Sequence, residues 1–168
     1  MMKTIKSRGV QLLGWVLVLV ALLSCQKEEG VIILTPEDQQ AIETLARDLP
    51  LILSNEGWEA YESTFSDDYL NWSMARDEVR SREDYLALVK DWYDQGNRAT
   101  GSTLKTIDFI PLTENAVMYL YALQEEFNDP ADSTKTLTRD IRFVATYQKE
   151  SGSWKNAFTA FMDLPQHQ

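Results

Sequence analysis

Cysteine and histidine are almost missing from this chain of 168 residues, which holds one of each. The single cysteine, Cys25, excludes a framework of intrachain disulfides. The only histidine, His167, stands in the C-terminal tail, so we expect neither histidine acid–base catalysis nor a histidine-based metal site. The sequence also holds no glycine-rich phosphate loop and no recognisable Ser/His/Asp set. We therefore predict no metal and no cofactor.

Basic residues are also scarce, with 16 Lys and Arg against 26 Asp and Glu, which gives a net charge of −10. A chain this acidic repels phosphate backbones, and no basic stripe interrupts the pattern. Binding to nucleic acid is therefore disfavoured. The acidic charge favours solubility instead.

A long membrane-spanning run is missing as well. The apolar run over residues 10–23 has 14 residues, whereas a spanning helix needs roughly 20. This run follows Lys3, Lys6 and Arg8 and ends just before Cys25. The pattern resembles a bacterial lipoprotein signal peptide. It implies cleavage before Cys25, lipid on the Cys25 sulfur and amine, and removal of residues 1–24.

The lipid would anchor the mature chain to a membrane of the bacterial cell envelope, and we expect the outer membrane. Two or three acyl chains exceed the single-chain threshold for stable binding. The acidic stretch at residues 26–29 resembles a surface-export signal of some lipoproteins, and it is also what a solvated linker would contain. Surface exposure therefore stays open. The leader carries three basic residues and no acidic ones, so the mature chain has a net charge of −13.

Residues 25–35 are predicted to form a tether, and residues 36–168 a single domain. Thr35 and Pro36 are typical of a helix start, and Pro50 predicts a break or kink in that helix. Trp58, Tyr61 and Phe65 are spaced for one face of a second helix. A short strand at residues 69–72 and a helix opened by Ser81 should follow.

The second half of the chain is rich in strand-forming residues. We predict strands over residues 103–112, 116–127, 134–147 and 154–162, separated by turn signals. Helices followed by a run of strands indicate an α+β fold with an antiparallel sheet. Long strands that cover helices on one face twist and curl around them. The expected shape is a cone around the N-terminal helices, with a cavity at its open end.

This order of elements resembles the nuclear-transport-factor-2-like (SnoaL-like) superfamily over about residues 36–163. The resemblance is carried by Trp58, Tyr61, Phe65 and Asp68 before the first strand, and by the hairpin at residues 152–155. It implies the cone fold, and it implies a homodimer formed through the outer sheet face. It does not choose an activity, because the superfamily includes isomerases, dehydratases and many binding proteins.

Aromatic side chains predict a small-molecule pocket in this cone, since such sites have apolar walls with a few polar groups. The same side chains could instead fill the cone as core. An arginine among strand hydrophobics needs an anionic partner, which Asp140, Glu125 or a bound carboxylate could supply. The candidate pocket residues are Trp58, Tyr61, Trp72, Trp92, Tyr119, Tyr121, Arg142 and Phe158.

Three functions remain open from the sequence. The first is a lipid-anchored protein that binds a small apolar or amphipathic ligand without catalysis. The second is a SnoaL-like isomerase, dehydratase or hydrolase, with Asp68, Tyr61 and Glu125 as the candidate acid–base residues. The third is an oligomerisation or interaction module with a closed cavity.

Overall fold

Helix α2 (Pro36–Asn55) begins where the sequence predicts a helix start. In the computed structural model, which describes residues 32–165, the Thr35 hydroxyl accepts a hydrogen bond from the Asp38 amide at 3.1 Å. The helix continues through Pro50 for one more turn. Leu53 in that turn is 2% exposed, and its burial compensates for the hydrogen bond that proline cannot donate.

Two shorter helices follow. Helix α3 (Trp58–Glu62) is shorter than the sequence predicts, because Phe65 already belongs to the first strand. Helix α4 (Arg82–Asp94) begins as predicted, and the Ser81 hydroxyl accepts from the Asp84 amide at 3.2 Å. This side-chain cap satisfies one of the free amides of the first turn.

Six strands form one sheet in the order β2-β1-β6-β5-β4-β3. Their bounds are β1 (Phe65–Ser73), β2 (Val79–Ser81), β3 (Ala99–Thr113), β4 (Ala116–Asp129), β5 (Asp132–Glu150) and β6 (Ser153–Asp163). Strand β1 runs parallel to β6, while the other neighbours are antiparallel. The sheet is therefore mixed rather than wholly antiparallel, since no hairpin fixes the direction of two strands so distant in sequence.

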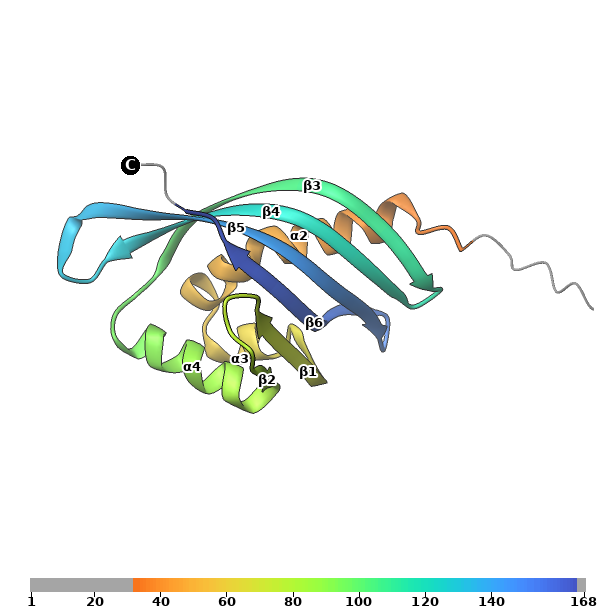
Figure 1. Cartoon of the computed structure of the whole chain (residues 1–168), viewed down its shortest axis with the longest axis horizontal. Helices are drawn as coiled ribbons and strands as arrows, with labels where there is room; N and C mark the ends of the chain where they lie inside the picture. Colours follow the sequence, from red (N-terminus) through yellow and green to blue (C-terminus); the bar gives the residue numbers. More distant parts are fainter. Residues whose placement is uncertain (1–31, 166–168) are drawn as a thin grey trace, which may run out of the picture. The chain divides into compact units, whose positions relative to one another are not determined.

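The sheet curves around the helices, and α2 lies along strands β3 to β5 (Figure 1). One core cluster joins Ile42 and Ala46 of α2 to Val117, Tyr119 and Tyr147 of the sheet. A second cluster contains Leu53, Tyr61, Phe65, Tyr69 and Leu86. The predicted α+β cone is confirmed.

The predicted signal peptide, Cys25 and the tether as far as residue 31 lie outside the described residues. Within residues 32–165, no helix combines the length and hydrophobicity that crossing a membrane requires. The same residues contain no cluster of three or more His, Cys, Asp and Glu side chains arranged to hold a metal ion.

Candidate functional site

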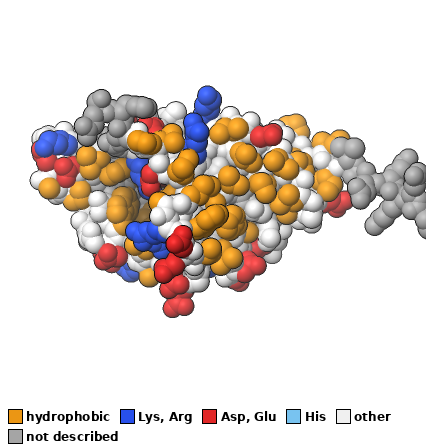
Figure 2. Space-filling view, in the orientation of Figure 1, with side chains coloured by type: hydrophobic (Ala, Val, Ile, Leu, Met, Phe, Trp, Pro, Cys, Tyr) orange, Lys and Arg blue, Asp and Glu red, His pale blue; other side chains and the backbone are white. Residues whose placement is uncertain are grey.

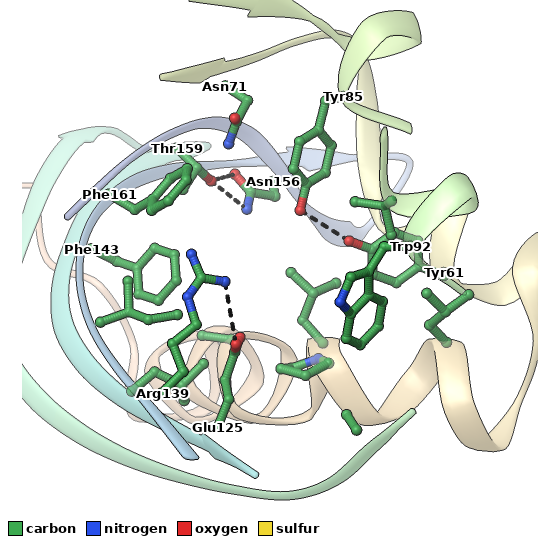
Figure 3. A pocket seen from close by; sticks show the side chains of 18 of the residues that line it. Tyr61, Asn71, Tyr85, Trp92, Glu125, Arg139, Phe143, Asn156, Thr159 and Phe161 are labelled. Carbon is green, nitrogen blue, oxygen red and sulfur yellow. Dashed lines mark hydrogen bonds and ion pairs between the residues drawn. The ribbon is translucent and has the colours of Figure 1, made fainter. Parts of the chain in front are cut away.

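A cavity of about 430 Å³ lies between the inner face of the sheet and helices α2 and α4. Figure 3 looks into it and shows side chains from the sheet facing side chains from the helices. Its volume falls within the range of roughly 300 to 1,000 Å³ that small-molecule sites occupy. Its apolar wall includes Leu49, Leu53, Leu88, Val89, Trp92, Leu123, Phe127, Ile141, Phe143 and Phe161.

Strand alternation places the residues of β4 and β5 that line this cavity. Tyr121, Leu123 and Glu125 follow one another on the inner face of β4. The strand pairing sets Phe143 opposite Tyr121, Ile141 opposite Leu123, and Arg139 opposite Glu125. Successive side chains on one face of a strand are two residues apart, so both strands contribute every second residue.

One ion pair lies inside the cavity. Arg139 Nη1 is 3.7 Å from Glu125 Oε2, and the Arg139 guanidinium also pairs with Asp163 at the end of β6. Burial raises the pKa of the Glu125 carboxyl, the Arg139 charge pulls that pKa down, and the Asp163 charge raises it further. Glu125 is thus a partly buried carboxylate whose charge depends on Arg139.

Two tyrosine hydroxyls meet on the helix side of the cavity. The hydroxyl oxygens of Tyr61 in α3 and Tyr85 in α4 are 3.0 Å apart (Figure 3). Burial raises the pKa of both phenols above the ordinary value of 10.0, so both stay protonated at neutral pH. One of the two hydroxyl hydrogens forms the hydrogen bond between the tyrosines, and the other is available to donate to a bound molecule.

Polar side chains from β1 and β6 form a third part of the wall. The Asn71 amide nitrogen donates to the Tyr69 hydroxyl at 3.2 Å, and the Asn156 amide nitrogen donates to the Thr159 hydroxyl at 2.9 Å. Asn71 is 2% exposed, yet its Oδ1 has no hydrogen-bond partner among the described residues. A buried acceptor without a partner costs about 1 to 3 kcal/mol, which a ligand with a donor would recover.

Four residues proposed from the sequence line the cavity. They are Tyr61, Trp92 and Tyr121 from the pocket set and Glu125 from the acid–base set. The other proposed residues do not line it: Trp58, Trp72, Tyr119, Arg142, Phe158 and Asp68.

Phe158 is displaced by a β-bulge. Tyr147 pairs with Asn156, but the preceding Thr146 pairs with Phe158, so Ala157 is an extra residue in β6. A bulge of one residue reverses the alternation beyond it. Phe158 therefore points to the outer face with Thr146, while Thr159 and Phe161 line the cavity.

Arg142 lies on the outer face of β5 and is exposed. The inner-face arginine is Arg139, three residues earlier, which pairs with Glu125. Alternation along β5 shows from the sequence alone that Arg139 and Arg142 lie on opposite faces of the sheet. It does not show which of these faces is the inner one, and only the pairing of Arg139 with Glu125 identifies it. The correct signal was this cross-strand pair of opposite charges.

The remaining proposed residues have structural positions. Trp72 and Asp68 are exposed on β1, and the Trp72 indole donates to the Arg76 carbonyl at 2.9 Å. Tyr119 is fully buried in the core cluster that contains Ile42 of α2, where it stacks on Phe109 at 4.1 Å between ring centroids. Trp58 packs beside Tyr61 at 6.0 Å between centroids, outside the cavity wall.

Sequence reasoning missed Tyr85, Asn71 and Arg80 in the wall. Asn71 and Arg80 are direct partners across β1 and β2, but the short strand β2 lies in a run of mixed charges that predicts a solvated loop. Tyr85 falls on the apolar face of its predicted helix, and that position does not separate a core residue from a pocket residue.

Solved protein structures share this architecture. No protein-family profile matches the sequence, and no curated protein does. Among solved structures, a ketosteroid isomerase-like protein from Erwinia carotovora atroseptica SCRI1043 has 15% identity and a TM-score of 0.59, covering 78% of this chain and 99% of its own.

Two other solved structures extend this likeness. A putative scytalone dehydratase from Novosphingobium aromaticivorans DSM 12444 has 15% identity and a TM-score of 0.61, covering 77% of this chain and 85% of its own. An NTF-2 like protein of unknown function from Shewanella oneidensis MR-1 has 14% identity and a TM-score of 0.52, covering 74% and 98%. The fold is nuclear-transport-factor-2-like. At these identities the likeness establishes the fold and leaves the activity open.

Proposed function

We propose that this chain is a lipid-anchored protein of the bacterial cell envelope that binds a small apolar or amphipathic ligand without catalysis. The observation that supports it best is the cavity of about 430 Å³, which the aromatic side chains leave open. Its wall is mostly apolar, with polar groups at three separate places. A closed-cavity interaction module does not fit such a space.

The carboxylates of the site support binding rather than acid–base chemistry. Glu125 is the one carboxylate among the described residues that line the cavity, and Arg139 holds it in an ion pair. Asp68 is exposed on β1, outside the cavity. A general acid or base needs a partner that orients it toward a reacting group, and Arg139 instead stabilises the charged form of Glu125.

Ligand binding is tested with the neutral fluorescent probe N-phenyl-1-naphthylamine, whose emission rises in an apolar site. We expect the purified chain to enhance this emission saturably. Val89→Trp adds volume to the cavity wall and should abolish the enhancement. Val79→Trp makes the same change at a side chain that is 53% exposed and should leave it intact. Equal behaviour of the two variants would refute binding in the cavity.

Lipid anchoring is tested separately in a Gram-negative host grown with an alkyne-labelled fatty acid. The proposal predicts label on the wild-type chain in the outer-membrane fraction, and neither label nor membrane association for Cys25→Ala. Protease added to intact cells then reports whether the domain faces the medium, as a surface-export signal at residues 26–29 would require. Labelling of the Cys25→Ala chain would refute the anchor at this residue.

An enzyme is the second candidate, and one observation favours it. The pKa of Glu125 is raised inside an open cavity, which is a common property of catalytic acids and bases. The enzyme hypothesis predicts proton exchange, so a β,γ-unsaturated ketone in D₂O should lose its α-proton NMR signal faster with the protein than in buffer. Glu125→Gln should abolish the acceleration. The binding proposal predicts no acceleration at all.

A further inference from the structure

Arg80 is a cation in the cavity wall without a carboxylate partner. It is half-buried on β2 and lines the cavity. Within residues 32–165, no hydrogen bond or ion pair engages its guanidinium. Arg139, the other cation of the wall, is already paired with Glu125 and Asp163. The hydrogen-bond donors of Arg80 are therefore available to a molecule in the cavity.

The register of the sheet places Arg80 beside the unpaired acceptor of the site. Asn71 of β1 pairs with Arg80 of β2 on one side and with Thr159 of β6 on the other. Direct cross-strand neighbours lie about 5 Å apart, so these three side chains form a polar row at one end of the sheet. A free guanidinium and the unpartnered Asn71 Oδ1 thus occupy neighbouring positions.

The same row becomes apolar further into the sheet. Thr159 pairs with Ala145, and Ala145 pairs with Tyr119. Arg139 lies six residues before Ala145, or about 20 Å along an extended strand. The backbone of Arg139 therefore lies several residues along the sheet from the row that holds Arg80, and its guanidinium is occupied by Glu125 and Asp163. The wall has one free positive end and a mostly apolar body.

We propose that the ligand of this cavity is a small organic anion, with an apolar body in the cone and a carboxylate on Arg80. A hydroxyl next to the carboxylate would donate to Asn71 Oδ1, which makes a hydroxy acid the best fit. This inference rests on the proposed ligand-binding function and names its ligand class. Guanidinium groups bind carboxylates through two parallel hydrogen bonds, and Arg80 is the residue that supplies them.

The acidic surface does not prevent this binding. The chain carries a net charge of −10, which slows the approach of an anion at low salt. At physiological ionic strength the field of distant charges is screened beyond about 8 Å. The adjacent guanidinium of Arg80 then has the larger effect on the bound carboxylate.

Calorimetric titration of the purified full chain tests the proposal with matched probes. They are 3-phenylpropanoate, the neutral 3-phenylpropan-1-ol, and 2-hydroxy-3-phenylpropanoate. We expect the carboxylate to bind about tenfold more tightly than the alcohol, as a charge-assisted hydrogen bond provides. The hydroxy acid should bind more tightly still. Arg80→Gln should remove the preference for the carboxylate and leave the alcohol unchanged.

Arg142→Gln is the matched control, because Arg142 is exposed on the outer face of the sheet, and it should change no affinity. Arg80→Lys should retain part of the preference. If the alcohol binds as tightly as the carboxylate, or if Arg80→Gln weakens both equally, the anion assignment is wrong and the apolar pocket stands. If neither these probes nor N-phenyl-1-naphthylamine binds, the proposed function fails as well.

Discussion

Arg139 lies directly opposite Glu125 in neighbouring strands, and their side chains meet inside the cavity with Arg139 Nη1 3.7 Å from Glu125 Oε2. The same guanidinium reaches Asp163 and lies 5.6 Å from the ring centroid of Phe161. One arginine therefore connects β4, β5 and β6 at one end of the cavity. Removing it would leave the partly buried Glu125 carboxylate without its counter-charge in the cavity, which is costly.

Glu125 should make the stability of the domain depend on pH. Burial raises its pKa above the ordinary value of 4.5, so the folded state binds its proton more tightly than the unfolded state does. Its contribution to stability is then fully present below pH 4.5 and is lost as pH rises through the folded pKa. We expect Glu125→Gln to flatten the decline in unfolding free energy over this range, measured by urea denaturation.

The control for this prediction is Glu126→Gln, the exposed neighbour on the other face of β4, which should keep the wild-type pH profile. A Glu125→Gln profile parallel to that of the wild type would show that Glu125 has the same pKa in both states. Such a result would also weaken the enzyme candidate, which depends on the raised pKa.

Asp38 should contribute to stability by joining α2 to the last hairpin. Its Oδ1 accepts from Lys149 Nζ at 2.7 Å and from the Trp154 indole at 2.8 Å. The Lys149 and Trp154 hydrogen bonds lower the pKa of Asp38, so this stabilisation is present above the unfolded pKa of 3.8 and is lost as pH falls through the folded one. Asp38→Ala should cost about 1 to 3 kcal/mol at pH 7.

The matched control is Asp94→Ala, which breaks an exposed pair with Lys90 on α4. Exposed helix pairs contribute about 0.3 to 0.5 kcal/mol. Urea unfolding of both variants gives the comparison. Equal losses would mean that the Asp38 contacts contribute no more than a surface ion pair does.

The sequence was sufficient to predict the helices, the long strands and the cone, because their hydrophobic patterns are long and capped. It was insufficient where one residue changes which face a side chain occupies. Alternation alone cannot locate Ala157, the extra residue of the β6 bulge, so it assigned Phe158 to the pocket. The sequence did not predict Arg80 in the cavity wall for a related reason. Strand β2 has only three residues, which are too few to show the two-residue alternation of a strand.

Deleting Ala157 tests the role of this bulge. Without the extra residue, Asn156 and Phe158 become consecutive and keep their partners in β5, so each side chain keeps its face. We therefore expect a loss below about 3 kcal/mol in unfolding free energy, measured by urea denaturation. Deleting Ala160, which lies outside the bulge, shifts the register beyond it and turns Phe161 away from the cavity. That deletion should cost more than the deletion of Ala157, and equal losses would mean that the bulge does not set the alternation of β6.

The outer face of the sheet should form a homodimer interface. Figure 2 shows hydrophobic side chains gathered over the region that Figure 1 draws as the sheet. On β1 and β6, Leu70 is 45% exposed, Trp72 37% and Met162 42%. An apolar face of this kind marks an interaction surface, and two-fold pairing of one face is the commonest arrangement of identical chains.

Val144 lies in the middle of this outer face, between Leu120 and Ala160 of the neighbouring strands. Val144→Glu should therefore convert a dimer into a monomer, because each copy would bury an unpaired charge at the interface. Sedimentation velocity of the wild type and the variant gives the two masses. Gln40→Glu adds the same charge at an exposed position of α2 and should remain dimeric. A monomeric wild type would refute the interface, and a dimeric Val144→Glu would place it elsewhere on the domain.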